Sequence, residues 1–315
     1  MKSINFRLII ALISVLTLLA VSCTDEDMNT IEVTPSTISF KADEITTKQL
    51  TITTDAPEWD FEVSDNNWIT VEQLSDKLNV TPKSFNTDII KRIATITVTA
   101  TSAEPVDIEV AQDGVPFGKS NYTATGTPLT LPNPASNSWS GELEVNDELG
   151  VIYYVISNWA NKTLLYLYYN NGQITLDATT VLFEYDNLYI CFAVGYIQGS
   201  NLTVKPASFQ YEIDYISTTK TLDFSGTVDG KTAVVGLVGR NKTSGEVQTF
   251  YSDTFYSNAK LVLTPKSSSP SNRVITNLNN NTLSGKEKLN LNTDRLTEDT
   301  KIPFEKSKSF SNFGK

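Results

Sequence analysis

The residues best suited to chemistry in this chain are aromatic side chains that stand beside polar ones. Trp159 lies in the stretch SNWANKT, Trp139 lies in NSWSGE, and Tyr166 and Tyr168 share one parity of TLLYLYYN. A flat ring with a polar edge can stack on the C–H face of a sugar. The sequence therefore predicts a glycan-binding surface with Trp159 as its first stacking residue, although strand tyrosines also commonly pair with each other across a sheet.

Two pairs of carboxylates could in principle perform acid–base chemistry. Glu142 and Glu144 are two residues apart, as are Glu212 and Asp214. Such neighbours on a strand are about 7 Å apart, and glycosidases place their two carboxyl groups about 5–10 Å apart. Both pairs alternate with apolar residues, which is typical of the solvated face of a sheet. We therefore expect no catalytic residues and no enzyme activity.

The amino-acid composition of the chain excludes several kinds of catalytic and binding site. The 315 residues include no histidine, and the formal net charge is −11. Without histidine the chain can form neither a Ser-His-Asp nor a Cys-His catalytic group, nor the usual zinc sites of histidine and cysteine. Nucleic-acid binding requires stripes of Lys and Arg, which an acidic chain does not favour. We expect no metal, no cofactor and no nucleic-acid partner.

The N-terminus has the pattern of an export signal. Lys2 and Arg7 precede the uncharged, apolar run 8–21, which is shorter than the roughly 20 apolar residues of a membrane span. The residues LAVS followed by Cys23 resemble a bacterial lipobox, and the acids at 25–27 resemble the surface-export signal of Bacteroidetes lipoproteins. The resemblance implies cleavage before Cys23, acylation of Cys23 and anchoring on the outer face of the outer membrane. The alternative is an ordinary secretory signal with an incidental cysteine.

Residues 31–113 show the alternation of antiparallel strands. In WDFEV, Trp59, Phe61 and Val63 share one face, and Asp60 and Glu62 share the other. A period of two with one polar face is typical of antiparallel sheets. Short strands of this kind over 80 to 100 residues predict an immunoglobulin-like β-sandwich.

The same region resembles a BACON domain, a module associated with Bacteroidetes surface proteins. The features that match are Trp59, Trp68, the run RIATITV and Gln112. The resemblance implies an all-β sandwich, and the name of the family records a suggestion of carbohydrate binding. Such modules can also serve as spacers, and the parity of Trp59 with Phe61 indicates that its ring fills the core.

The region that follows is also rich in strands. Tight-turn pairs at Asn171-Gly172, Asp186-Asn187 and Asp229-Gly230 separate apolar runs and predict successive hairpins. Such a series favours a sandwich, a jelly roll or an up-and-down barrel. Cys191 lies in the apolar run LYICFAVGY, where a buried, inert thiol is expected.

The last 50 residues are polar and carry nine Lys and Arg against five Asp and Glu, a charge of 9 − 5 = +4. A segment of this composition is predicted to be disordered. The alternative is a segment that orders on a partner protein with Phe304, Phe310 and Phe313 as anchors. The predicted division is a lipoprotein signal peptide at 1–22, an acidic tether at 23–30, the sandwich at 31–113, a linker at 114–120, a second β domain at 121–265 and a polar tail at 266–315.

Two functions remain after these exclusions. In the first, a surface lipoprotein binds a polysaccharide or mucin-type glycan through its second β domain, with the BACON-like sandwich as spacer or accessory binder. In the second, the chain is an adhesion or assembly component that binds a partner surface protein through residues 266–315. The sequence favours the first because of its aromatic loops.

Overall fold

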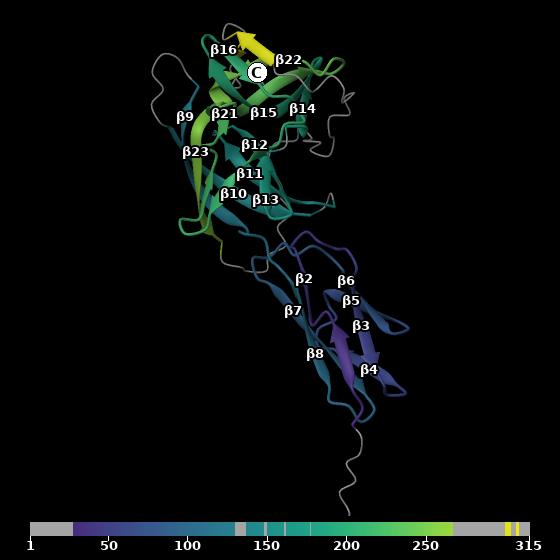
Figure 1. Cartoon of the computed structure of the whole chain (residues 1–315). Coiled ribbons are helices and arrows are strands. Elements are labelled where there is room, and N and C mark those ends of the chain that lie inside the picture. The colour runs from purple at the N-terminus through teal and green to yellow at the C-terminus, as the bar shows by residue number, and fades with distance from the viewer. Residues whose placement is uncertain are drawn as a thin grey trace, which may run out of the picture. The chain divides into compact units, whose positions relative to one another are not determined.

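The structure is a computed structural model that describes residues 28–129, 137–147, 150–160, 162–176, 178–266, 300–303 and 307–308. The predicted signal peptide at 1–22, the lipidation site Cys23, most of the acidic tether and the three tail phenylalanines lie outside these ranges. Strands make up nearly all of the described regular structure, and the all-β prediction is confirmed (Figure 1). No helix in the described ranges is long and apolar enough to span a bilayer.

The first eight strands form two four-stranded sheets, as expected of a sandwich. Their order in the first sheet is β1-β3-β6-β5 and in the second β2-β8-β7-β4. The strands of the first sheet are β1 (Ile31–Thr34), β3 (Lys48–Thr54), β6 (Lys77–Pro82) and β5 (Ile69–Leu74). Those of the second are β2 (Thr37–Phe40), β8 (Val106–Gln112), β7 (Arg92–Ala100) and β4 (Trp59–Val63). Alternate residues of β7 are buried, which is the pattern read from RIATITVTA.

Two buried amide side chains hold the loops that follow the sandwich strands. Gln112 donates from its side-chain amide to the carbonyl oxygens of Ala42, Glu44 and Ser84. Asn86 donates from its amide to the carbonyl oxygens of Ile90, Gln112 and Asp113. Buried polar groups are costly unless they are hydrogen-bonded, so these bonds fix the loops. Gln112 and Asn86 therefore have a structural role in this part of the chain.

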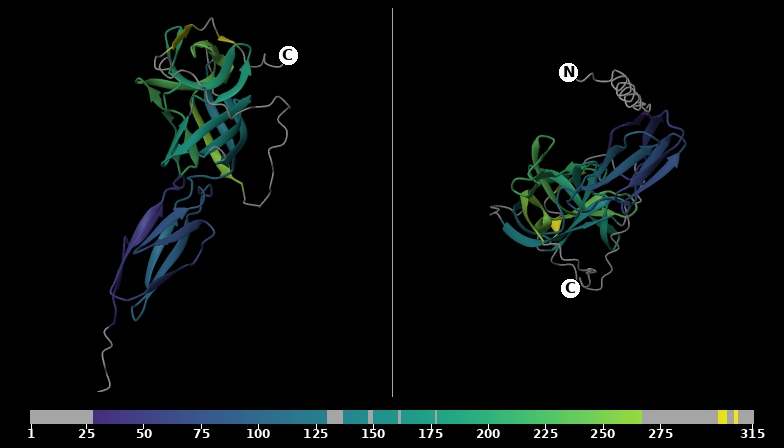
Figure 2. Two further views of the ribbon diagram at one scale, coloured as in Figure 1. Left: turned by 90° about the vertical axis from the view of Figure 1, so that its right-hand side faces the viewer. Right: turned by 90° about the horizontal axis from the view of Figure 1, so that it is seen from below.

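The second region closes on itself as a barrel, one of the architectures that the sequence left open. A circuit of antiparallel pairings runs β9-β10-β11-β12-β13-β17, crosses to β18, and returns through β19 and β23 to β9. Figures 1 and 2 show these strands curling around a common interior. The circuit comprises β9 (Ser120–Pro128), β10 (Asn137–Asn146), β11 (Ile152–Trp159), β12 (Thr163–Asn170), β13 (Gln173–Leu176), β17 (Tyr211–Glu212), β18 (Asp214–Ile216), β19 (Thr221–Asp223) and β23 (Tyr256–Pro265).

The remaining strands form a layer that joins the barrel through the pairing of β21 with β23. They are β14 (Val181–Tyr185), β15 (Leu188–Gln198), β16 (Asn201–Val204), β20 (Thr227–Val228), β21 (Lys231–Asn241), β22 (Val247–Tyr251), β24 (Thr300–Pro303) and β25 (Ser307–Lys308). On β15, Ile190 and Phe192 belong to the core of the barrel, whereas Cys191 and Ala193 belong to a second core. Burial on both faces explains the continuous apolar run, and the Cys191 thiol is buried, as predicted.

The predicted hairpins are present at all three turn pairs. Asn171 and Gly172 connect β12 to β13 with φ of +50° and +90°. Asp229 and Gly230 connect β20 to β21 with φ of +51° and +72°. Positive φ at both central residues defines the type I′ turn, which only Gly, Asn and Asp adopt readily.

Part of the predicted disordered tail is ordered, and this corrects the sequence analysis. Strand β24 pairs antiparallel with β16, and Ile302 is 2% exposed within the second core. Strand β25 pairs in parallel with β22. The average composition of the last 50 residues is polar, so it gave no sign that Ile302 would be buried. This side chain packs in the second core where β24 pairs with β16.

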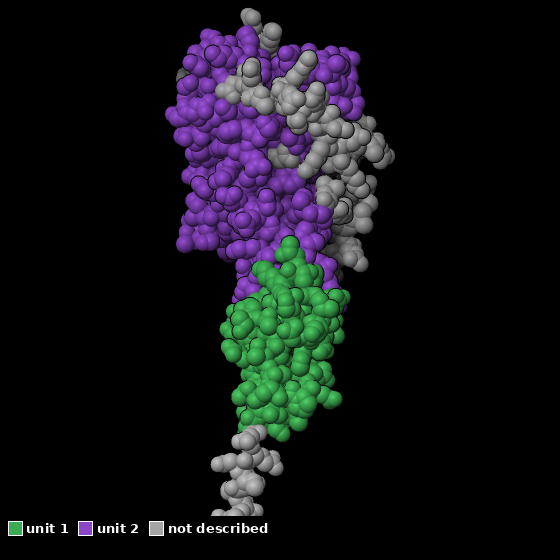
Figure 3. Space-filling view, turned by 45° about the vertical axis from the view of Figure 1, so that its right-hand side comes forward, with its two compact units in different colours: residues 1–38, 46–81, 93–110 green, residues 39–45, 82–92, 111–315 purple. Residues whose placement is uncertain are grey.

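The compact units also differ from the predicted division (Figure 3). The second unit includes the segments Ser39–Ile45 and Pro82–Arg92 in addition to the residues from Ala111 onward. The predicted linker 114–120 is packed, because Val115 and Phe117 are buried in the core of the barrel and Phe117 stacks on Tyr154 at 4.3 Å. Turn residues in QDGVPFGKS suggested a linker, but the two apolar side chains between them bind this segment to the second unit.

Candidate functional site

Trp159, the first predicted stacking residue, is a core residue with 0% exposure. Its indole nitrogen donates to the carbonyl oxygen of Thr254 at 3.2 Å, and its ring contacts Phe224 at 5.1 Å. The reason is a β-bulge, because the register of β11 with β12 shifts between Ile156 and Trp159, where Asn158 has φ of +59°. An extra residue in a strand reverses the side-chain alternation. Trp159 therefore points inward and cannot stack on a ligand.

Trp139 is also buried, with 5% exposure. It lies on β10 at the parity of Leu143 and Val145, which face the core. Its ring packs on Tyr256 at 4.6 Å and on Trp159 at 5.4 Å. Both tryptophans thus stabilise the interior of the barrel, and the prediction that they bind glycan is wrong.

The two predicted tyrosines lie on the outer face of β12. Leu165, Leu167 and Tyr169 are buried, whereas Tyr166 and Tyr168 are half-buried, as alternation predicted. Tyr153 of β11 lies between them, with ring centroids 6.2 Å from Tyr166 and 6.3 Å from Tyr168. This row is a set of cross-strand aromatic pairs, and only Tyr168 extends from it into a pocket.

The second unit contains a pocket of about 450 Å³ beside the β12–β13 hairpin. Such volumes are typical of small-ligand sites. The hairpin supplies one wall, and the loop before β17 supplies another. The lining residues are Asp43, Phe85, Gly150, Val151, Tyr168, Tyr169, Asn170, Gln173, Thr175, Leu176, Thr179, Ala207, Ser208, Phe209 and Gln210. All of these belong to the second unit.

The pocket combines aromatic rings with amide and hydroxyl groups. Phe209 and Tyr168 offer half-buried rings, and the amides of Asn170, Gln173 and Gln210 are exposed. This combination offers an apolar surface for C–H groups together with donors and acceptors for hydroxyl groups. The combination of a ring with polar neighbours, which the sequence analysis expected at Trp159 and Trp139, is therefore found at Phe209 and Tyr168.

Local contacts hold several of these side chains in place. The Tyr168 hydroxyl and the Thr180 hydroxyl are 2.9 Å apart in a hydrogen bond. The Gln173 amide donates to the Glu212 carboxylate at 3.2 Å. Lys205 covers one side of the Phe209 ring, with its ammonium nitrogen 5.3 Å from the ring centroid. Because these side chains are already held in place, binding of a ligand would cost less side-chain entropy.

Two phenols of β12, that of Tyr166 outside the pocket and that of Tyr169 in its lining, are not acids or bases at physiological pH. Burial raises the pKa of Tyr166. Burial also raises the pKa of Tyr169, and the charges of Asp43 and Asp113 raise it further. Both side chains are neutral at pH 7, so they can take part in stacking and hydrogen bonding.

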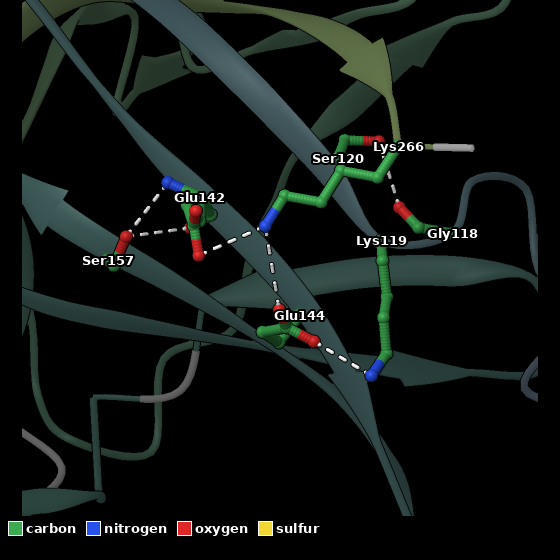
Figure 4. Close-up of polar contacts among 7 residues, drawn as sticks. All are labelled: Gly118, Lys119, Ser120, Glu142, Glu144, Ser157 and Lys266. Carbon is green, nitrogen blue, oxygen red and sulfur yellow. Dashed lines mark hydrogen bonds and ion pairs between the residues drawn. The ribbon is translucent and has the colours of Figure 1, made fainter. Parts of the chain in front are cut away.

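The carboxylates Glu142 and Glu144 lie on the outer side of β10 in a set of ion pairs (Figure 4). Lys266 approaches Glu142 at 3.0 Å and Glu144 at 3.9 Å, and Lys119 approaches Glu144 at 3.0 Å. Lys119 precedes β9 and Lys266 follows β23, so the pairs tie together the two ends of the barrel chain. The second pair, Glu212 and Asp214, is exposed on either side of the buried Ile213. The solvated-face interpretation of both pairs agrees with these positions.

Sequence reasoning missed most of the pocket residues. Phe209 and Gln210 lie in a loop, because β17 begins only at Tyr211. Asn170 and Gln173 flank the Asn171-Gly172 turn. This turn was the one sequence signal for the two residues, because side chains beside a turn lie at the end of a hairpin. Asp43 is 128 residues away from Asn171 in the turn of the hairpin, and no local pattern could connect them.

Comparisons with known proteins are sparse for this chain. No family model matches it, and no curated protein matches it. One solved structure that it resembles is the GH5 xyloglucanase of Bacteroides ovatus in complex with a XXXG heptasaccharide, with 25% identity over 26% of this chain and a TM-score of 0.23. The match covers 18% of that enzyme. Another is a DUF4784 family protein from Bacteroides caccae, with 8% identity over 75% of this chain and 84% of that one and a TM-score of 0.18. These TM-scores are too low for either likeness to carry an argument.

Proposed function

We propose that the chain is a lipid-anchored protein of the bacterial outer surface that binds glycan without transforming it. The observation that carries this proposal is the pocket beside the β12–β13 hairpin, with its half-buried rings and exposed amides. Phe209 and Tyr168 supply the stacking surface, and Asn170, Gln173 and Gln210 orient the hydroxyl groups of the sugar.

The remaining parts of the proposal come from the sequence. The lipobox-like residues before Cys23 and the acids after it support an anchor at the cell surface. Several acyl chains, each methylene contributing about 0.8 kcal/mol on burial, would hold the protein stably in a membrane. The BACON-like sandwich between the anchor and the second unit would then act as a spacer.

The alternative of partner binding through residues 266–315 is less favoured. Strand β24 pairs with β16 in the same chain and buries Ile302. A partner that used this strand would have to displace it from the second core. The part of the tail that the structure describes thus contributes to folding.

Binding to immobilised polysaccharides and mucin glycans tests the proposal. We expect Phe209→Ala to weaken binding of the full chain about tenfold, because a stacking ring contributes about 0.5–1.5 kcal/mol beyond the apolar area that it buries, and it also orients the sugar. Tyr185→Ala is the matched control, since that ring is 52% exposed and does not line the pocket. Equal binding by the two folded variants would refute the site, and mass spectrometry of Cys23 checks the anchor separately.

A further inference from the structure

The charges of the pocket indicate which class of glycan it accepts. Among the lining residues that the structure describes, Asp43 is the only one with an acidic side chain, and none is Lys or Arg. We infer that the pocket binds uncharged sugars and excludes acidic ones, with the Asp43 carboxylate as a hydrogen-bond acceptor for sugar hydroxyl groups. This inference rests on the proposed function of the same pocket.

Asp43 is fixed at the rim by the β12–β13 turn. One of its carboxylate oxygens accepts a hydrogen bond from the backbone N–H of Asn171 at 2.7 Å. The turn itself is of type I′, because Asn171 and Gly172 both have positive φ. A carboxylate has about four lone-pair sites, so one backbone bond orients the group and leaves acceptor capacity at a residue that lines the pocket.

The surroundings add negative charge. Glu212 accepts the hydrogen bond of the Gln173 amide. Burial raises the pKa of the Tyr169 phenol, and the negative charges of Asp43 and Asp113 raise it further. Lys205 is the cation that packs on Phe209, and Asp229 neutralises it at 3.1 Å. A carboxylated or sulfated sugar would therefore meet like charges, and no Lys or Arg stands among the described lining residues to offset them.

Hydroxyl groups and carboxylates differ in what they need from such a site. A hydroxyl group can donate to Asp43 and accept from an amide such as Asn170 or Gln210, which the rim offers. An ionised sugar carboxylate can only accept, and it cannot accept from Asp43. The geometry therefore matches a ligand rich in hydroxyl groups and without charge.

The test compares each neutral polysaccharide with its own carboxymethylated derivative. Galactomannan, arabinoxylan and desialylated mucin glycans are assayed against the full chain in 0.15 M and 1 M salt. We expect the neutral form of a bound polysaccharide to bind at least tenfold more tightly than its derivative. Asp43→Asn should weaken neutral binding severalfold and reduce this preference at least fivefold. Glu72→Gln removes the same charge from an exposed position on β5 of the first unit and should leave the preference unchanged.

Each result decides one of the two claims. If the carboxymethylated form binds as tightly as the neutral form and Phe209→Ala abolishes both, the proposed function stands and the charge selectivity is refuted. If Asp43→Asn and Glu72→Gln change the preference equally, the selectivity comes from the net charge of the chain and the role of Asp43 is refuted. If none of these polysaccharides binds in a manner that depends on Phe209, the proposed function fails as well.

Discussion

Trp159 and Phe209 are both aromatic residues beside polar ones in the sequence, yet the second unit places them in opposite surroundings. Trp159 is surrounded by aromatic rings of the barrel core, whereas Phe209 lies half-buried at the wall of a pocket. The difference arises from backbone geometry, because a bulge turns Trp159 inward and an irregular loop leaves Phe209 beside open space. Residue type alone therefore does not distinguish a packing ring from a binding ring.

The largest expected effect is on stability, at Trp159. Trp159→Ala should reduce the free energy of unfolding by about 3–5 kcal/mol, because it leaves a large cavity in a closely packed core. Urea unfolding followed by circular dichroism measures this loss. Tyr185→Ala should stay within about 0.5 kcal/mol of wild type. Folded Trp159→Ala protein should still bind ligand, and specific loss of binding without loss of stability would invalidate the contrast with Phe209.

A smaller effect is expected at the ordered part of the tail. Ile302→Ala should lower the free energy of unfolding by about 2–4 kcal/mol, because Ile302 is buried in the second core. Lys301→Ala changes the exposed neighbour on the same strand and is the control. Similar urea midpoints for the two variants would mean that β24 does not contribute to the fold and that the tail is available to a partner.

The smallest effect appears only at alkaline pH. Burial raises the pKa of the Tyr154 hydroxyl, with further increases from Tyr169 and Tyr215. The unfolded phenol ionises near pH 10 while the folded one keeps its proton, so stability falls as pH rises above that value. At pH 11, Tyr154→Phe should therefore lose about 1.4 kcal/mol less of its free energy of unfolding than the wild type does.

At neutral pH the same substitution should be harmless, because the Tyr154 hydroxyl has no hydrogen-bond partner among the described residues. Thermal unfolding between pH 7 and pH 11 provides the measurement, with Tyr185→Phe as the exposed counterpart. The same dependence of stability on pH in the two variants would contradict the burial of the Tyr154 hydroxyl in the barrel core.

Several parts of the fold were predictable because they depend on local rules. Alternation in TLLYLYYN separated the inner Leu165, Leu167 and Tyr169 from the outer Tyr166 and Tyr168. The Asn-Gly and Asp-Gly pairs located hairpins, since few residues tolerate positive φ at both turn positions. The uninterrupted apolar run around Cys191 indicated a buried thiol, and the structure places it in a strand that is buried on both faces.

Other features depend on contacts that no local pattern contains. The sequence by itself determined an all-β chain, its turns and the faces of its regular strands, because a period of two and a few turn residues suffice for these. Only the tertiary structure decided that Trp159 is buried, that Ile302 completes a sheet and that Asp43 meets the hairpin at Asn171. A bulge reverses parity without a sequence signature, and side chains that are more than a hundred residues apart meet only when the chain has folded.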